Sequence, residues 1–128
     1  MRFLLDTHVL VWWLYDVPRL SPSAFRLLSQ ENAEILVSAV SAFEIANKFR
    51  LGKWQEIAVL AASFDTVVDS GGFTMLPVTN IHASCAGLLA GEHRDPFDRL
   101  IAAQAQVERL SVVSADAAFD GLGAVRIW

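Results

Sequence analysis

The sequence predicts an α/β fold in which a central parallel sheet of about five strands carries helices on both faces. Short apolar segments rich in β-branched residues alternate with helical segments along the whole chain. Each apolar segment is nearly continuous, which is typical of strands that are buried on both faces. The 128 residues are 54% hydrophobic and 19% charged, so they can build a sizeable core, and we expect one domain spanning residues 1–128.

The chain is expected to begin with a buried strand and two helices. FLLD, at 3–6, is the strand, and it continues without a break into a helix over 7–15. Serine caps helix N-termini and proline suits the first helical position, so Ser21 and Pro22 predict the start of a second helix. This helix should extend to about Gln30.

A second strand and two longer helices follow. EILVS, at 34–38, is the strand, and the next helix spans 40–50. The side chains on or near one stripe of this helix are Val40, Phe43, Asn47 and Leu51. After the break at LGKW, residues 55–70 are expected to form one helix that ends at Gly71-Gly72, because glycine commonly follows a helix C-terminus.

The last part of the chain completes the alternation. The three strands expected here are 74–78, 110–115 and 124–128. One helix spans 81–90 and ends at Gly91. Asp95 is a good helix cap, and Pro96 fits the first position of a helix that runs to about Arg109.

The composition narrows the classes of protein that this chain can represent. No apolar run reaches the length of a membrane span, and the N-terminal run is interrupted by Asp6 and His8, which also argues against a secretory signal. The single cysteine, Cys85, is expected to be a small buried residue. We therefore expect a cytoplasmic protein without a membrane segment. With a net charge of −4, nucleic-acid binding would need a local basic patch or a bound metal.

Four acidic residues are expected at one edge of the sheet: Asp6, Glu44, Asp98 and Asp116. Asp6 ends the first strand, Asp116 follows the fourth, Glu44 lies early in the helix after the second strand, and Asp98 lies in the first turn of the helix that precedes the fourth strand. Sites in parallel sheets form outside the carboxyl ends of the strands. Crowded carboxylates repel one another unless a cation joins them, and Mg²⁺ prefers oxygen ligands. The pattern therefore predicts metal-dependent phosphate chemistry.

Each acid also has a structural interpretation, which the sequence leaves open. Asp6 could cap the first helix, and Asp116 could cap the short turn AAFDG. Glu44 could pair with Lys48 one helical turn later. Asp98 could do no more than favour the helix dipole at a well-formed helix start.

Four longer segments surround these acids: LLDTHVLVWWL, VSAVSAFEIANKFRLGK, HRDPFDRLIAAQA and VVSAD. They resemble segments of PIN-domain ribonucleases, and specifically of the toxins of VapBC toxin–antitoxin pairs. Each segment alone is a weak signal. Together they occur in the order and spacing of that family and span essentially the whole chain.

This resemblance implies a Rossmann-like fold, Mg²⁺ or Mn²⁺, endonucleolytic cleavage of RNA, a homodimer, and neutralisation by a small antitoxin in a heterotetramer or larger complex. The residues it makes catalytic are Asp6, Glu44, Asp98 and Asp116, the metal ligands among them being Asp6, Asp98 and Asp116. Asp95 matches a further acid of the DPFDR subgroup, and Ser114 a Thr or Ser position near the metal. His8 stands where many relatives have Asn, but histidine is frequent in the D-T-H subgroup.

Several basic and histidine residues near these acids have two interpretations. Lys48, Arg50 and Lys53 form either a solvated helix end or a grip on the RNA backbone. His8 and His93 could assist proton transfer, although a structural hydrogen bond to a loop carbonyl is the expected role. His82, at a helix start, is expected to be structural. Arg99 is expected to pair with a neighbouring acid.

Trp12 and Trp13 are adjacent on a helix and must point in different directions, so one core cannot easily bury both. An interface with a second copy or with an antitoxin is expected for this region, because aromatic residues are enriched at interfaces.

Three other functions can be compared with this pattern of residues. The main alternative is a non-catalytic RNA- or protein-binding module with a degenerate PIN fold, against which the intact acidic set argues. A receiver domain would need a lysine near the last strand, where only Arg126 is present. A haloacid-dehalogenase-like phosphatase would need D-x-D after the first strand, where this chain has D-T-H.

Overall fold

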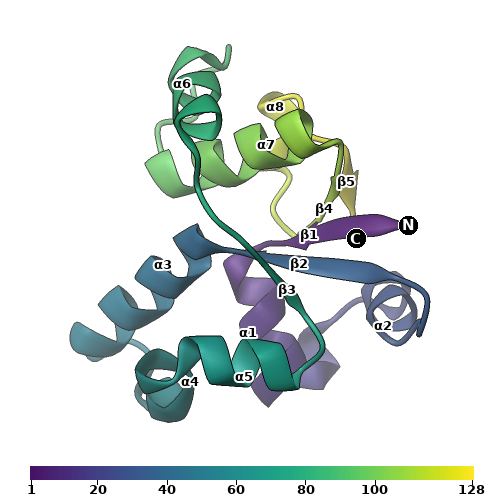
Figure 1. Cartoon of the computed structure of the whole chain (residues 1–128), viewed down its shortest axis with the longest axis vertical. Helices are drawn as coiled ribbons and strands as arrows, with labels where there is room; N and C mark the ends of the chain where they lie inside the picture. The colour runs from purple at the N-terminus through teal and green to yellow at the C-terminus, as the bar shows by residue number, and fades with distance from the viewer.

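A computed structural model, which describes all residues 1–128, contains a five-stranded parallel sheet in the order β3-β2-β1-β4-β5 (Figure 1). The strands are β1 (Arg2–Leu5), β2 (Glu34–Ser38), β3 (Thr74–Leu76), β4 (Ser111–Val113) and β5 (Arg126–Ile127). The first strand of the chain is therefore the central one, and its last residue, Leu5, pairs with Val37 of β2 and Val113 of β4. The predicted parallel α/β sheet is confirmed.

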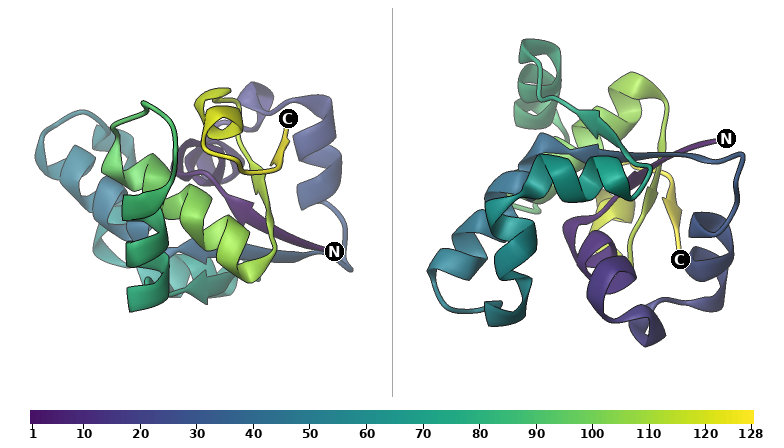
Figure 2. Two further views of the ribbon diagram at one scale, coloured as in Figure 1. Left: turned by 90° about the horizontal axis from the view of Figure 1, so that it is seen from above. Right: turned by 60° about the horizontal axis from the view of Figure 1, so that its bottom comes forward.

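Helices cover both faces of this sheet (Figures 1 and 2). They are α1 (Thr7–Tyr15), α2 (Pro22–Leu28), α3 (Ala39–Arg50), α4 (Ala58–Ala62), α5 (Phe64–Ser70), α6 (Asn80–Leu88), α7 (Pro96–Glu108) and α8 (Ala118–Gly121), with 3₁₀ turns η1 (Val17–Arg19) and η2 (Gln55–Ile57). None of these helices has both the length and the apolar character needed to cross a lipid bilayer.

Two apolar cores lie on opposite faces of the sheet. Side chains alternate between the faces along a strand, so Phe3 and Leu5 of β1 enter one core while Leu4 enters the other. The first core packs the sheet against α1, α2, α4 and α5, and the second packs it against α7 and α8. The small side chains Ala102 and Ala105 let α7 approach the sheet closely.

The strands β3, β4 and β5 are shorter than the predicted ranges 74–78, 110–115 and 124–128.

The prediction of one continuous helix over residues 55–70 is wrong, because the structure divides that segment into η2, α4 and α5. The division between α4 and α5 falls at Ser63, whose backbone lies outside the helical region at φ −133° and ψ 44°. Serine competes with helical geometry by bonding to nearby backbone groups, which makes it a weak point in an otherwise apolar segment. Leu60 and Phe64 are still buried on either side of it.

Two further expectations about burial are corrected. The predicted stripe on α3 is wrong, because its buried residues are Val40, Ser41 and Ile45, while Phe43 is 56% exposed. Phe43 packs instead against Phe97 of α7, with ring centroids 5.3 Å apart. Cys85, the single cysteine, is a free thiol and is only partly buried, so the expectation that it is buried is wrong. It lies on α6, which packs mainly against α7 and leaves the opposite side of the α6 helix in solvent.

Candidate active site

All four predicted acids line one cleft of about 680 Å³ at the carboxyl edge of the sheet. The complete lining is Asp6, His8, Trp12, Arg19, Glu44, Asn47, Lys48, Asp95, Phe97, Asp98, Ala115 and Asp116. The parallel sheet explains this convergence. β1 and β4 end side by side, while α3 begins where β2 ends. Five of the lining residues are acidic and two are basic, so the floor of the cleft is strongly acidic.

Asp6 occupies the first position after the central strand. Its backbone N–H donates to the carbonyl of Val113 at 3.1 Å, which extends the β1–β4 ladder by one residue. The hydroxyl of Ser114 then donates to Asp6 Oδ2 at 2.7 Å. Asp6 stands at the N-cap position of α1, as one interpretation of the sequence allowed, but its side chain makes no capping bond to that helix. Burial raises the pKa of Asp6, partly offset by the Ser114 hydroxyl.

Asp116 approaches the same edge from the loop after β4. Its backbone N–H donates to Ser114 Oγ at 3.0 Å, so one hydroxyl contacts both the Asp6 side chain and the Asp116 backbone. Asp116 Oδ1 also accepts from the N–H of Ala118 at 2.9 Å. The expected contact with the turn that follows is therefore present, and it orients a carboxylate that also lines the cleft.

Glu44 reaches the cleft from α3. Thr7 Oγ1 donates to Glu44 Oε1 at 2.8 Å and lies 2.8 Å from Ser41 Oγ. Since a hydroxyl has one proton, Ser41 must donate to Thr7 when Thr7 donates to Glu44. Glu44 forms no ion pair with Lys48, so the alternative interpretation of Glu44 as a surface partner of this lysine is excluded. Burial raises the pKa of Glu44.

The start of α7 brings three potential metal ligands together. Asp95 caps the helix as predicted, accepting from the N–H groups of Phe97 at 2.9 Å and Asp98 at 3.4 Å through Oδ1. Asp98 Oδ2 lies 2.7 Å from His93 Nε2, which corrects the expected contact of His93 with a loop carbonyl. Ligand atoms of His93, Asp95 and Asp98 all lie within 4.8 Å of one another. Burial raises the pKa of Asp98, and the bond to Asp98 raises the pKa of His93.

The carboxylates also influence one another across the cleft. The charge of Asp116 raises the pKa of Asp6 further, and the charge of Asp6 does the same for Glu44 and for Asp98. Several oxygen donors of like charge that line one cleft suit a hard divalent cation, which binds carboxylates and keeps several waters. The donor set thus fits Mg²⁺ or Mn²⁺ and offers no cysteine for a soft metal.

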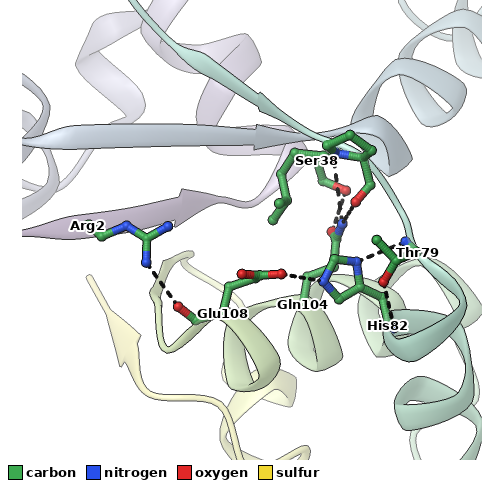
Figure 3. A network of polar contacts seen from close by, with 8 residues as sticks. Arg2, Ser38, Thr79, His82, Gln104 and Glu108 are labelled. Carbon is green, nitrogen blue, oxygen red and sulfur yellow. Dashed lines mark hydrogen bonds and ion pairs between the residues drawn. The ribbon is translucent and has the colours of Figure 1, made fainter.

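A buried polar contact that the sequence analysis missed connects the elements that carry these acids (Figure 3). Ser38, the N-cap of α3, donates to Gln104 Oε1 from the middle of α7. Gln104 Nε2 donates to the carbonyl of Pro77 at 3.2 Å and lies 3.5 Å from that of Leu76, at the end of β3. Both Ser38 and Gln104 are fully buried. A glutamine within the small-residue run IAAQA was the available signal, because buried amides need partners.

His82 has the structural role that was predicted. Its Nδ1 accepts from the backbone N–H of Thr79 at 3.0 Å, while Thr79 Oγ1 accepts from the N–H of His82, so the two residues close the N-terminus of α6 (Figure 3). Since Nδ1 is an acceptor, the ring proton lies on Nε2 and donates to Glu108 at 2.9 Å. The backbone carbonyl of Glu108 accepts from Arg2, so this contact joins α6, α7 and β1.

The basic residues divide into those at the cleft and those outside it. Lys48 lines the cleft, whereas Arg50 donates to Asn47 and Lys53 is exposed outside the lining. Arg19, which the sequence analysis did not single out, also lines the cleft. The expected pairing of Arg99 with an acid is wrong. Its guanidinium donates to three backbone carbonyls, including those of Ala86 and His93 at 3.0 Å, because the last turn of α6 and the loop before α7 present these carbonyls to it.

The two adjacent tryptophans point in different directions, as predicted. Trp12 lines the cleft, where its ring centroid lies 5.8 Å from that of His8. Trp13 instead packs against Phe25 of α2, with centroids 6.0 Å apart.

A family model described as PIN domain matches residues 3–125 of the chain. The structure is similar to VapBC2 from Rickettsia felis, solved with a DNA fragment from the promoter, with a TM-score of 0.74, 17% identity, and 99% of this chain and 98% of that chain covered. It is similar to FitAcB from Neisseria gonorrhoeae, with a TM-score of 0.70, 19% identity and coverage of 100% and 97%. It is also similar to VapBC-1 from nontypeable Haemophilus influenzae, with a TM-score of 0.64, 15% identity, and 99% of this chain and 97% of that chain covered. No curated protein matches the chain. At these identities the structures show a shared fold.

Proposed function

The chain belongs to the PIN domain family, and from this premise we propose that it is a metal-dependent endoribonuclease and the toxin of a type II toxin–antitoxin pair. The observation that carries the proposal is the single cleft lined by Asp6, Glu44, Asp98 and Asp116. Four carboxylates at one edge of a parallel sheet can hold a divalent cation against a phosphodiester, and the family's acids match these four positions.

In the proposed reaction, Asp6, Asp98 and Asp116 would hold Mg²⁺ or Mn²⁺. A divalent cation bound there would supply water of lowered pKa and stabilise the charge that develops on the phosphoryl group. Ser114 orients two of the three ligands, because its hydroxyl donates to Asp6 and accepts from the backbone of Asp116. Asp95 keeps the start of α7, and with it Asp98, in place.

Glu44 approaches the same cleft from a different helix and is held by Thr7, which gives it a separate role in the proposal. A carboxylate oxygen that accepts from Thr7 has a defined orientation, and its second oxygen can accept a hydrogen bond from a water molecule in the cleft. We assign Glu44 to positioning this water beside the scissile phosphate. Lys48 lines the same cleft and is placed to contact the RNA backbone.

The proposal includes a small cognate antitoxin, a homodimer and a cytoplasmic location. The structural neighbours described above are VapBC2, FitAcB and VapBC-1, and a further similar structure is a toxin–antitoxin complex from Klebsiella pneumoniae. These names describe those proteins, and the shared fold supports an equivalent partnership for this chain.

The experiment that tests the proposed activity is cleavage of RNA by the purified chain with and without Mg²⁺ or Mn²⁺, beside Asp6→Asn. We expect endonucleolytic products only with metal and only from the parent. Equal cleavage by both proteins would indicate a contaminating nuclease and contradict the proposal. RNA binding without cleavage under any metal condition would favour the alternative, a non-catalytic binding module.

A further inference from the structure

We propose that Trp12 is a stacking platform for one unpaired nucleobase of the RNA strand and that the guanidinium of Arg19 covers the other face of that base. This inference rests on the proposed function and extends it, because it makes the substrate at the cleft a single-stranded segment. The juxtaposition that carries it is an aromatic ring and a cation on the wall of the same cleft whose floor is acidic.

The indole of Trp12 is held in place by its neighbours without being stacked by them. The ring centroids of His8 and Trp128 each lie 5.8 Å from that of Trp12, at interplanar angles of 53° and 55°. Neither neighbour is parallel to the indole, so neither forms the face-to-face contact that a nucleobase makes on an aromatic side chain. Trp12 is only partly buried and lines the open cleft.

Arg19 lies over the indole at a distance close to that needed for a base to enter between them. Its Cζ atom is 5.9 Å from the Trp12 ring centroid. A planar ring stacked on both sides needs about 3.5 Å to each partner, or about 7 Å in total. The Arg19 side chain is 63% exposed, and its only ion pair is with Asp16, itself exposed. An opening of about 1 Å is therefore within the freedom of this side chain.

A second cation continues this wall on the α3 side of the cleft. Lys48 Nζ lies 4.3 Å from the ring centroid of Trp54, and the edge of His8 packs on Trp54 with centroids 5.3 Å apart. Arg19 and Lys48 are the two basic residues in the cleft lining. In a chain with a net charge of −4, they provide the local positive charge that a phosphate backbone requires beside the acidic floor. Basic side chains beside an exposed aromatic ring are the combination with which proteins bind single strands.

The chain provides a matched control for this proposal. Trp13 is the next residue on α1 and carries the same side chain, but it packs against Phe25 and does not line the cleft. Loss of the Trp13 indole removes similar packing without touching the proposed platform.

The test measures binding of a fluorescein-labelled single-stranded RNA of about 12 nucleotides and mixed sequence, a length within the site sizes of single-strand binders. Fluorescence anisotropy is recorded with Ca²⁺ in place of Mg²⁺, because Ca²⁺ takes the same oxygen ligands with looser geometry. A series of strands carries one abasic nucleotide at each position in turn. Each strand is titrated with the parent, Trp12→Leu, Trp12→Phe and Trp13→Leu, after thermal unfolding has shown that each variant is folded.

We expect one abasic position to weaken binding to the parent about tenfold, equivalent to about 1.4 kcal/mol, within the range for a base stacked on an aromatic ring. In Trp12→Leu the same abasic position should have no further effect, whereas Trp12→Phe and Trp13→Leu should retain it. An undiminished effect in Trp12→Leu would overturn the platform while leaving the proposed nuclease intact. If Trp12→Leu does not fold, Arg19→Gln decides the question. The abasic effect should fall at least threefold in Arg19→Gln, because the guanidinium that covers the base is gone, and an undiminished effect would overturn the proposal. Absence of binding to any strand would contradict both the platform and the proposed RNA substrate.

Discussion

Asp6 is a buried carboxylate that accepts a hydrogen bond from one hydroxyl and forms no ion pair. Burial and the neighbouring charge of Asp116 raise its pKa above the ordinary value of 3.8. Without metal, ionised Asp6 therefore destabilises the folded chain. Asp6→Asn should raise the melting temperature of the metal-free protein at pH 7 by at least about 3 °C, corresponding to about 1 kcal/mol for a domain of this size.

The pH dependence of this effect has a definite sign. A carboxyl group whose pKa is raised on folding stabilises the fold in its protonated form, and this stabilisation is lost as the pH rises from the unfolded pKa, near 3.8, through the folded one. The advantage of Asp6→Asn over the parent should therefore disappear as the pH falls below about 4. Thermal unfolding of the parent and of Asp6→Asn in EDTA, from pH 7 to below pH 4, measures this difference in melting temperature. A variant less stable than the parent at pH 7 would mean that Asp6 is a structural partner.

Replacement by asparagine should have different effects at the two aspartates at the start of α7, Asp95 and Asp98. Asp95 uses Oδ1 to accept from Phe97 and Asp98, and asparagine retains such an oxygen. Asp98 contributes charge to the cleft. Asp98→Asn should reduce the single-turnover rate of RNA cleavage at least about 100-fold, the scale on which a positioned electrostatic group acts. Asp95→Asn should reduce it about tenfold, as expected for a supporting contact.

Saturating metal is essential in this comparison, because weakened metal affinity would otherwise resemble lost chemistry. Equal losses would make Asp95 a metal ligand in its own right, as its position within 4.8 Å of His93 and Asp98 permits. If Asp98→Asn cleaves RNA as fast as the parent, Asp95 to Asp98 form only the start of helix α7 and have no catalytic role.

At the scale of elements, Gln104 of α7 forms a buried hydrogen bond that links α7 to the start of α3. Its amide joins the N-cap of α3 to the end of β3, and α3 and α7 carry Glu44 and Asp98 (Figure 3). Gln104→Leu would leave the hydroxyl of Ser38 and the carbonyl of Pro77 buried without this partner. We expect a loss of about 2–3 kcal/mol in the free energy of unfolding, measured with urea.

The control for this change is Gln106→Leu, two residues further along the same helix. Gln106 is exposed, so water can satisfy the carbonyls of Ala102 and Leu122 to which it donates, and the loss should stay below about 1 kcal/mol. Similar losses in both variants would mean that Gln104 contributes packing alone.

The contrast between Asp95 and Gln104 shows how far sequence reasoning reaches. A cap, a strand and the residue after a strand are local features, so the elements and the convergence of the four acids at one sheet edge could be predicted. The partner of a buried amide depends on which elements meet in space, and Gln104 lies 66 residues from Ser38. The same limit applies to Phe43, which its helical position favours for the core, whereas the actual partner is Phe97 of α7. Arg19 was missed because its role depends on Trp12 lying beside it.

For the whole molecule, metal binding should act as a stabilising ligand because it relieves the repulsion among the acids of the cleft. Mg²⁺ at about 100 times its Kd should raise the free energy of unfolding by about 2.7 kcal/mol. Asp116→Asn is the suitable comparison, since Asp116 is exposed and its loss leaves the core intact. Thermal unfolding with Mg²⁺ and with EDTA should show a smaller gain for this variant. An equal gain would place the ion elsewhere.

The strand order has a consequence for the time at which the cleft becomes complete during synthesis. The central strand β1 is made first, and one of its two neighbours, β4, is made among the last residues of the chain. Asp6 therefore lacks its contact with Ser114, and the nearby carboxylate of Asp116, while about 100 further residues are synthesised, which takes about 5 to 20 seconds at ribosomal rates. Until then, a growing chain holds Asp6 and Glu44 without the other half of the acidic set. If the finished protein cuts RNA as proposed, this topology keeps the nascent chain harmless to the ribosome that is making it.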